Sequence, residues 1–155
     1  MKDNLIYFPG VWHESMEELY EKMTLEELKE IARIHEIAGL YKFNKSKQIA
    51  VIISNILSRE YMWEFFLCAS PEELELFEQI AEDDEVLEEE EADLQQMMRY
   101  FFRGGYILLG DDGKMIIPEE VRTAYRRLNT PEFQKAHREY NTAYNYCCGI
   151  TALYG

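Results

Sequence analysis

The feature that most limits the fold is a pair of stretches, 25–35 and 49–57, in which apolar residues recur every three or four positions. This spacing gathers apolar side chains on one face of an α-helix. Just before the first stretch, Thr24 and Glu27 match a capping box, in which the hydroxyl caps a free N–H and the carboxylate reaches back. The pattern therefore predicts an amphipathic helix that starts after Thr24.

The two stretches are joined by a short connection, Leu40–Phe43, that is apolar at both ends. Gly39 is a natural stop for the first helix. Asn44 or Ser46 can cap the second helix, which we expect to close near Leu57. The sequence therefore predicts a helix, an extended loop and a second helix.

Three short segments of this unit match a known family. They are Leu28-Lys29-Glu30-Ile31-Ala32, Lys45-Ser46-Lys47-Gln48, and the apolar set Ile52, Ile53, Ile56 and Leu57. Residues 24–57 thereby resemble the SAP-like module found at the N-terminus of the transcription terminator Rho. The resemblance implies a module that its relatives often use to touch DNA or RNA, and sometimes only to fold against a neighbour.

The rest of the chain predicts further helices around one β-hairpin. We expect residues 1–12 to be extended and 82–85 to form a loop. The expected helices are 13–23, 61–67, one that opens at Ser70 and Pro71, 88–103, one from Pro118 to about Leu128, and a last one that starts at Phe133.

The hairpin is predicted by two short apolar strands, 106–109 and 115–117, on either side of the turn sequence Gly110-Asp111-Asp112-Gly113. In element order, residues 71–128 look like a winged helix, with 88–103 in the place of the recognition helix and Gly110–Lys114 in that of the wing tip. The predicted fold is mainly α with one β-hairpin. It divides into 1–60 with the SAP-like module, 61–130 as a winged-helix-like domain, and 131–155 as a C-terminal helix.

Acidic residues are distributed unevenly along the chain. The 155 residues include 16 Lys and Arg and 30 Asp and Glu, a net charge of -14. Residues 1–60 carry a net charge of -2, residues 61–97 carry -14 and residues 98–155 carry +2. The total argues against a general coat for nucleic acid or an anionic membrane, but either end can carry a local basic patch.

The three cysteines are an odd number, which argues against a disulfide scaffold and fits a reducing compartment. The start of the chain lacks the apolar segment of a signal peptide. No apolar run reaches the roughly 18 residues of a membrane span. We therefore expect a cytoplasmic protein without a membrane partner.

Motifs for catalysis and metal binding are incomplete. Gly105 and Gly110 have the spacing of a P-loop, but Asp111 follows where a Lys is needed. Neither His13 nor His35 is followed by the second His of a HExxH zinc helix. We expect no metal, no cofactor and no enzymatic activity.

Two groups of basic residues are the candidate nucleic-acid-binding residues. They are Lys42, Lys45 and Lys47 in the loop and second-helix start of the SAP-like unit, and Arg99, Arg103 and Lys114 at the end of the predicted recognition helix and the wing. Amines beside free helix N–H groups suit phosphate contacts. The sequence therefore favours a non-enzymatic, transcription-related module that binds nucleic acid. We expect the contact to be weak, because a few lysines neutralise only a few phosphates.

The alternative is a protein-interaction or scaffold module. Its acidic segment, 82–93, would dock a basic protein partner, and its C-terminal helix would assemble. Residues 143–154 are nearly all apolar or aromatic, which is unusual for a chain end. Two hypotheses account for this: the chain is the N-terminal part of a longer protein, or the helix packs in a homodimer. An acidic inhibitor that imitates DNA is a third function.

Overall fold

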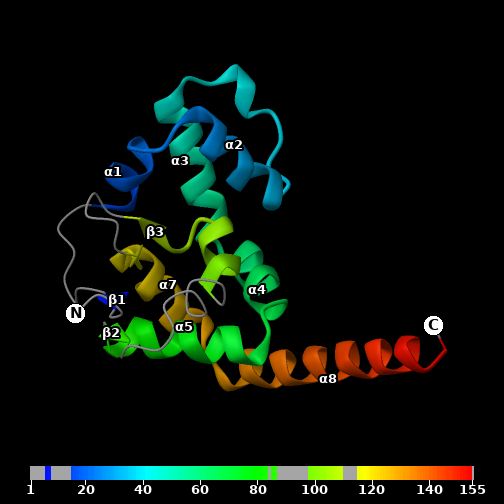
Figure 1. The fold of residues 1–155 in the computed structure, drawn as a ribbon. Coiled ribbons are helices and arrows are strands. Elements are labelled where there is room, and N and C mark those ends of the chain that lie inside the picture. Colours follow the sequence, from blue (N-terminus) through cyan, green and yellow to red (C-terminus); the bar gives the residue numbers. More distant parts are fainter. Residues whose placement is uncertain (1–5, 8–14, 84, 87–97, 110–114, 155) are drawn as a thin grey trace.

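Helices form most of the structure, which is a computed structural model (Figure 1). It describes residues 6–7, 15–83, 85–86, 98–109 and 115–154, and over these ranges the chain is mainly helical, as predicted. The elements in chain order are β1 (Ile6–Tyr7), α1 (Met16–Glu21), α2 (Leu25–Ile34), the 3-10 helix η2 (Leu40–Lys42), α3 (Lys45–Ile56), α4 (Arg59–Leu67), α5 (Pro71–Asp83), β2 (Glu85–Val86), β3 (Leu108–Leu109), β4 (Met115–Ile116), α7 (Glu119–Leu128) and α8 (Pro131–Tyr154). Residues 98–103 are helical as well.

Side-chain caps start the two N-terminal amphipathic helices. At α2, Thr24 Oγ1 accepts a hydrogen bond from the Glu27 N–H at 3.1 Å, and Glu27 Oε1 accepts one from the Thr24 N–H at 2.8 Å. At α3, Asn44 Oδ1 accepts from the Lys47 N–H at 2.9 Å, so Asn44 rather than Ser46 is the cap. Each cap stabilises its helix by about 0.5–2 kcal/mol.

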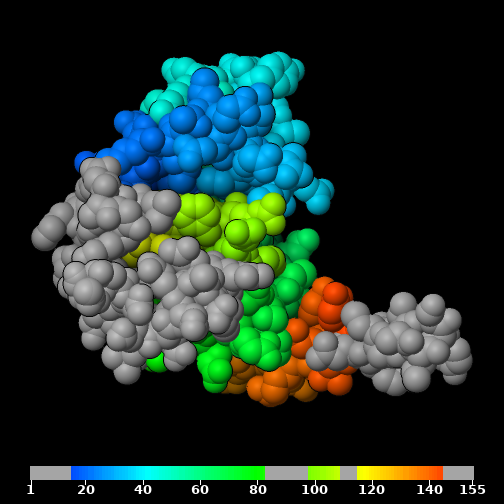
Figure 2. All heavy atoms as spheres, viewed as in Figure 1, coloured from blue at the N-terminus to red at the C-terminus, as the bar shows by residue number. Residues whose placement is uncertain are grey.

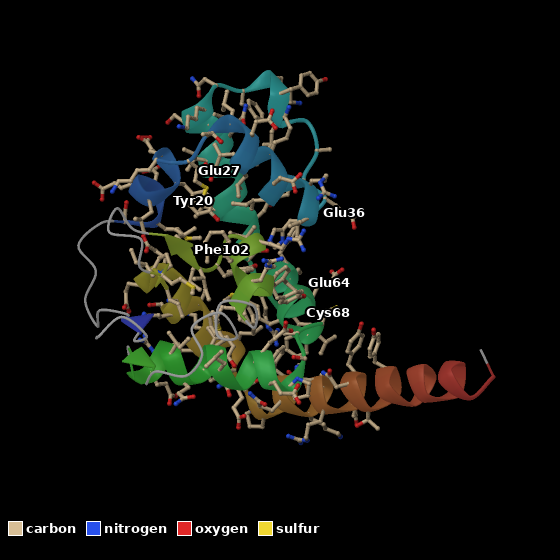
Figure 3. All side chains as sticks on the ribbon, viewed as in Figure 1. Tyr20, Glu27, Glu36, Glu64, Cys68 and Phe102 are labelled. Carbon is tan, nitrogen blue, oxygen red and sulfur yellow. The ribbon has the colours of Figure 1, made fainter. Side chains whose placement is uncertain are left out.

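The helix α2 ends earlier than the sequence predicts. Its closing left-handed residue is Glu36, with φ of 56°, which lies at the tip of the helix in Figure 3. The Glu36 N–H bonds to Arg33 O at 3.1 Å and the Ile37 N–H to Ala32 O at 2.8 Å, a Schellman arrangement. The prediction that Gly39 stops this helix is wrong, because these bonds already pair the carbonyls of Ala32 and Arg33 and end the helix before residue 39. Gly39, with φ of 82°, precedes η2 instead.

The apolar faces of α2 and α3 are buried, as their spacing predicts. Their buried residues are Leu28, Ile31 and Ala32 on α2 and Ile49, Ile52 and Ile56 on α3. Complete burial of one such aliphatic side chain contributes about 1.5–3 kcal/mol. Leu25, predicted on the same face, is 54% exposed because it occupies the first position of its helix. One hydrophobic cluster runs from Met16 to Phe133, so the segments 1–60 and 61–130 share a core.

A glycine turn joins the N-terminal helices to the rest of the molecule. The Tyr20 hydroxyl donates a hydrogen bond to Gly105 O at 2.8 Å, and His35 Nε2 lies 2.8 Å from Gly104 O. A Cβ added at Gly105 would lie 2.2 Å from the Tyr20 hydroxyl oxygen, and one at Gly104 would lie 2.3 Å from the Phe65 ring. Gly105 also has φ of 84°, a conformation that favours glycine. The close approach of these helices therefore requires both glycines.

The acidic end of α5 is held by a strand pair. The Ser70 hydroxyl caps α5, as predicted, and the helix runs to Asp83. Ile6 of β1 then pairs antiparallel with Val86 of β2. The predicted loop at 82–85 is wrong, because the first two of these positions are helical and the last is in β2.

Residues 87–97 lie outside the described ranges, so most of the predicted helix 88–103 is not tested.

The two predicted hairpin strands pair antiparallel, as β3 and β4, although each is shorter than predicted. The predicted turn at 110–113 lies outside the described residues. A buried arginine of α7, Arg122, donates from Nε to Ile117 O at 3.0 Å and from Nη1 to Ala81 O at 2.6 Å. This side chain therefore ties the end of the hairpin to α5.

The last helix, α8, is anchored near its start by contacts with α4 and with Ala69. It begins at Pro131, just before the predicted Phe133. The Phe133 ring packs edge-on against Trp63 of α4, with centroids 5.1 Å apart, and His137 Nε2 lies 2.8 Å from Ala69 O. Figure 1 shows the C-terminal part of α8 running out past the rest of the ribbon. Across the described residues, no helix carries an apolar stretch long enough to cross a bilayer.

Replacement of Gly105 by Ala is expected to lower the free energy of unfolding by about 2–5 kcal/mol. The left-handed backbone costs about 1–2 kcal/mol for a residue with a Cβ, and the overlap with Tyr20 adds about 1–3 kcal/mol. The matched control is Gly39→Ala, where φ is also positive but the new Cβ meets only Lys42, at 3.8 Å. Urea denaturation compares the two. Equal losses would show that the contact with Tyr20 does not limit position 105.

The second prediction concerns pH. His35 is packed against Tyr61, Phe65 and Tyr106, and burial lowers its pKa although the hydrogen bond to Gly104 opposes the shift. The unfolded chain therefore takes up a proton near the ordinary value of about 6.5 while the folded chain does not.

Stability should accordingly fall as the pH drops below this value. The measurement is the free energy of unfolding from about pH 7.5 to about pH 5, for the wild type and His35→Gln. Groups common to both proteins cancel in the difference, so identical pH dependence in the two proteins would contradict the prediction.

Candidate nucleic-acid interface

Two of the predicted lysines gather around one aromatic ring. Lys42 Nζ lies 5.5 Å and Lys47 Nζ 5.7 Å from the centroid of the Phe43 ring. Both lysines are exposed, while Phe43 packs against the core. Attraction between an ammonium group and an aromatic face holds each amine near the ring, by about 0.5–1 kcal/mol at an exposed site. Lys42 of η2 and Lys47 of α3 therefore present two positive charges beside one anchored ring.

The third lysine of this group has another contact. Lys45 Nζ donates a hydrogen bond to Glu21 O at 2.8 Å, and the Lys45 side chain is half-buried. Glu21 is the last residue of α1, and the last carbonyl oxygens of a helix have no partner within the helix. The helix dipole also makes this end attractive to a positive charge. Lys45 therefore joins α1 to α3 and does not extend the exposed pair.

Hydrogen bonds hold the turn that carries Lys42 and Phe43. Phe43 N–H donates to Leu40 O at 2.9 Å, and Gln48 Nε2 donates to Phe43 O at 2.9 Å. A Cβ built at Gly39 would lie 3.8 Å from Lys42 Cε, so this lysine folds back over the glycine. The backbone bonds and the left-handed glycine thus fix where the amine of Lys42 lies.

An open groove of about 590 Å³ lies beside this loop, between α2 and η2. Its lining residues are Leu25, Glu26, Lys29, Ala32, Arg33, Ile37, Gly39, Leu40, Tyr41 and Gln48. Tyr41 is 89% exposed, and Leu25 is the other largely exposed apolar residue in the groove. Figure 2 shows the segment around residues 40–50 at the upper edge of the molecule.

The charges around the groove are positive on balance. Lys29 stands on its wall against Glu26, and Lys42 lies over its Gly39 edge. Arg33 is paired with Glu30 at 2.8 Å, an exposed ion pair that is nearly neutral overall. This local excess contrasts with the net charge of -14 for the whole chain.

The second predicted group of basic residues does not form a patch with the first. Arg99 and Arg103 are both exposed on the helical segment 98–103, and Lys114 lies outside the described residues. Arg103 lines a separate cavity of about 330 Å³ with Glu27 and Glu30. Figure 3 shows the labelled Glu27 on α2 above Phe102, the neighbour of Arg103.

The carboxylates near Arg103 change how this arginine can act. Hydrogen bonds and charge from Arg33 hold the pKa of Glu30 below its ordinary value, and the charge of Arg103 adds to the effect. An ionised carboxylate close to Arg103 weakens its attraction for phosphate. The arrangement therefore favours the Lys42 and Lys47 pair as the anion-binding part of the molecule.

Sequence reasoning missed the role of two aromatic residues of the loop. Phe43 supplies the base on which the amines rest, and Tyr41 stands at the groove. The sequence does show an aromatic residue on each side of Lys42. In a short apolar connection, however, such residues are also typical of ordinary packing, so the pattern alone did not indicate a binding role. Among the described residues, no three His, Cys, Asp or Glu side chains are placed to hold a metal ion.

Comparisons with known proteins identify no family. No protein-family model matches the chain, and no curated protein or solved structure is similar to it at a significant level. The function must therefore be inferred from the geometry above.

Proposed function

We propose that this protein is a non-enzymatic, nucleic-acid-associated module whose N-terminal unit contacts phosphates through Lys42 and Lys47. The single observation that supports this most is the convergence of the two amines on Phe43, at 5.5 and 5.7 Å. Because both charges lie close together, they can meet neighbouring phosphates of one strand.

The local order of elements agrees with this function. A helix, a short connection and a helix cover residues 24–57, in keeping with the SAP-like resemblance. Lys42 lies in the connection and Lys47 in the first turn of α3. The winged-helix-like domain follows in the proposal, with α5, the 98–103 helix, the paired strands and α7 in the expected order. Its recognition helix and wing tip fall largely outside the described residues.

The contact is weak, and its dependence on salt is modest but measurable. Each neutralised phosphate contributes about 0.9 to the salt slope of duplex binding and about 0.7 for a single strand. Two lysines therefore give a slope below about 2. A site of this strength acts beside other contacts, such as those of a larger transcription complex in the cytoplasm.

The double variant Lys42→Glu, Lys47→Glu is expected to lower affinity for DNA and RNA at least about tenfold at low salt, because attraction becomes repulsion. Fluorescence anisotropy with labelled single- and double-stranded oligonucleotides measures the loss. Binding by the wild type should weaken with salt along the slope given above. A wild type that binds none of the four nucleic acids at low salt would falsify the proposed function.

Two control variants distinguish loss of the Lys42 and Lys47 site from a general effect of net charge on binding. Lys135→Glu with Arg138→Glu makes the same change in net charge on exposed positions of α8 and should leave binding within about twofold. Lys45→Gln removes the bond to Glu21 O and should lower stability slightly, by about 0.5–1.5 kcal/mol, with little loss of affinity.

The second candidate function is assembly through α8. Its observation is the helix α8, which packs against α4 and whose C-terminal part runs out past the rest of the ribbon (Figure 1). Tyr140 and Tyr144 are 39% and 58% exposed, and residues 140–155 include no Asp, Glu, Lys or Arg. An uncharged surface of this kind suits another uncharged surface, so the partner in this function is a second copy of α8. The acidic segment 82–93, the other docking element considered, lies mostly outside the described residues.

For this candidate we expect Tyr144→Lys to convert a dimer to a monomer, because a buried lysine without a partner opposes association. Analytical ultracentrifugation over a range of concentrations measures the change. Thr142→Lys adds the same charge at an exposed position elsewhere around the helix and should keep the dimer. A wild-type chain that stays monomeric at every concentration contradicts assembly.

A further inference from the structure

We propose that the groove beside Tyr41 receives a base of single-stranded nucleic acid, with the adjoining phosphates on Lys42 and Lys47. This inference rests on the proposed function and adds to it the class of nucleic acid that the site selects. It also gives a role to the most exposed large apolar side chain among the described residues.

The first support is the exposure of Tyr41. It is 89% exposed, although Leu40 just before it packs into the core and Phe43, two residues after it, packs against the core. The backbone of this turn is fixed by the bond from Phe43 N–H to Leu40 O, so Tyr41 is held out in the solvent by a rigid loop. A ring presented in this way can stack on a base without a further cost of ordering the loop.

The second support is the groove itself. Its volume of about 590 Å³ lies within the roughly 300–1,000 Å³ that small-ligand sites occupy. Leu25, Ile37 and Leu40 give it apolar walls, which suit the faces of a base. Polar groups of Lys29 and Gln48 lie on the same lining and can meet the polar edge of the base.

The third support is charge complementarity. Lys42 lies over Gly39, which lines the groove, and shares the Phe43 ring with Lys47. A chain with a net charge of -14 repels a phosphate backbone in general, so a bound strand has to pass where the balance is positive. The positive side chains lie beside an exposed aromatic ring, which is the combination of backbone attraction and stacking that single-strand sites use.

This arrangement favours a single strand over a duplex. In a duplex the bases are stacked on one another, and their faces are closed to Tyr41. A flexible single strand can place one base in the groove while its phosphates reach the two lysines. A duplex can use only the lysines.

The test measures the affinity of the full 155-residue chain for three labelled probes: a short oligothymidine, the same strand with abasic sites, and a duplex of equal length. Tyr41→Ala is expected to lower affinity for oligothymidine about 5- to 150-fold, the range of one base stacked on an aromatic ring. It should leave the abasic strand and the duplex unchanged. Tyr41→Phe keeps the ring and should bind like the wild type. Because Tyr41 is exposed, neither variant should change the thermal midpoint of unfolding.

The outcomes separate the two proposals. If Lys42→Glu with Lys47→Glu abolishes binding but Tyr41→Ala binds oligothymidine like the wild type, the lysine site stands and base stacking is overturned. Equal wild-type affinity for the abasic strand and oligothymidine also overturns it, because a phosphate chain alone then accounts for binding. If the wild type binds none of the three probes, this inference is overturned. The proposed function fails with it when the single- and double-stranded RNA oligonucleotides are not bound either.

Discussion

The arrangement of the molecule depends on the close approach of two side chains to consecutive glycine carbonyls. Tyr20 from α1 and His35 from α2 each reach the backbone of the Gly104–Gly105 turn at 2.8 Å. Phe65 from α4 covers the same turn, where a Cβ would overlap its ring. Three helices from the first half of the chain thus meet one bend in the second half. The absence of a Cβ at both glycines allows these helices to approach the turn closely.

Sequence predicts those parts of this fold that are decided within a few residues. The caps by Thr24 and Ser70 and the apolar spacing of α2 and α3 are local, and the structure agrees with them. The structure differs from the prediction where contacts between distant segments determine the conformation. The pairing of β1 with β2 joins residues that are about 80 positions apart in the sequence, and no local sequence pattern predicts it. The end of α2 depends on Glu36 adopting a conformation that its own preference opposes.

The candidate site shows the same division. The sequence places three lysines in one loop and helix start, but it does not say which way each amine points. Lys45 is directed to Glu21 O because α1 packs against α3, a contact between helices. Lys42 and Lys47 share Phe43 because that ring is anchored in the core. The exposure of Tyr41 likewise follows from a turn closed by backbone bonds, which residue type alone does not reveal.

The distance along the chain between the turn and its partners has a consequence for synthesis on the ribosome. The bond from Tyr20 to Gly105 O spans 85 residues, and that from His35 to Gly104 O spans 69. At roughly 5–20 residues per second, about 4–17 s separate the translation of Tyr20 from that of its acceptor. During this interval α1, α2 and α3 can pack on one another, but the surface that receives the glycine turn stays open to water. The nascent N-terminal unit therefore completes its packing only after residue 105 has left the exit tunnel.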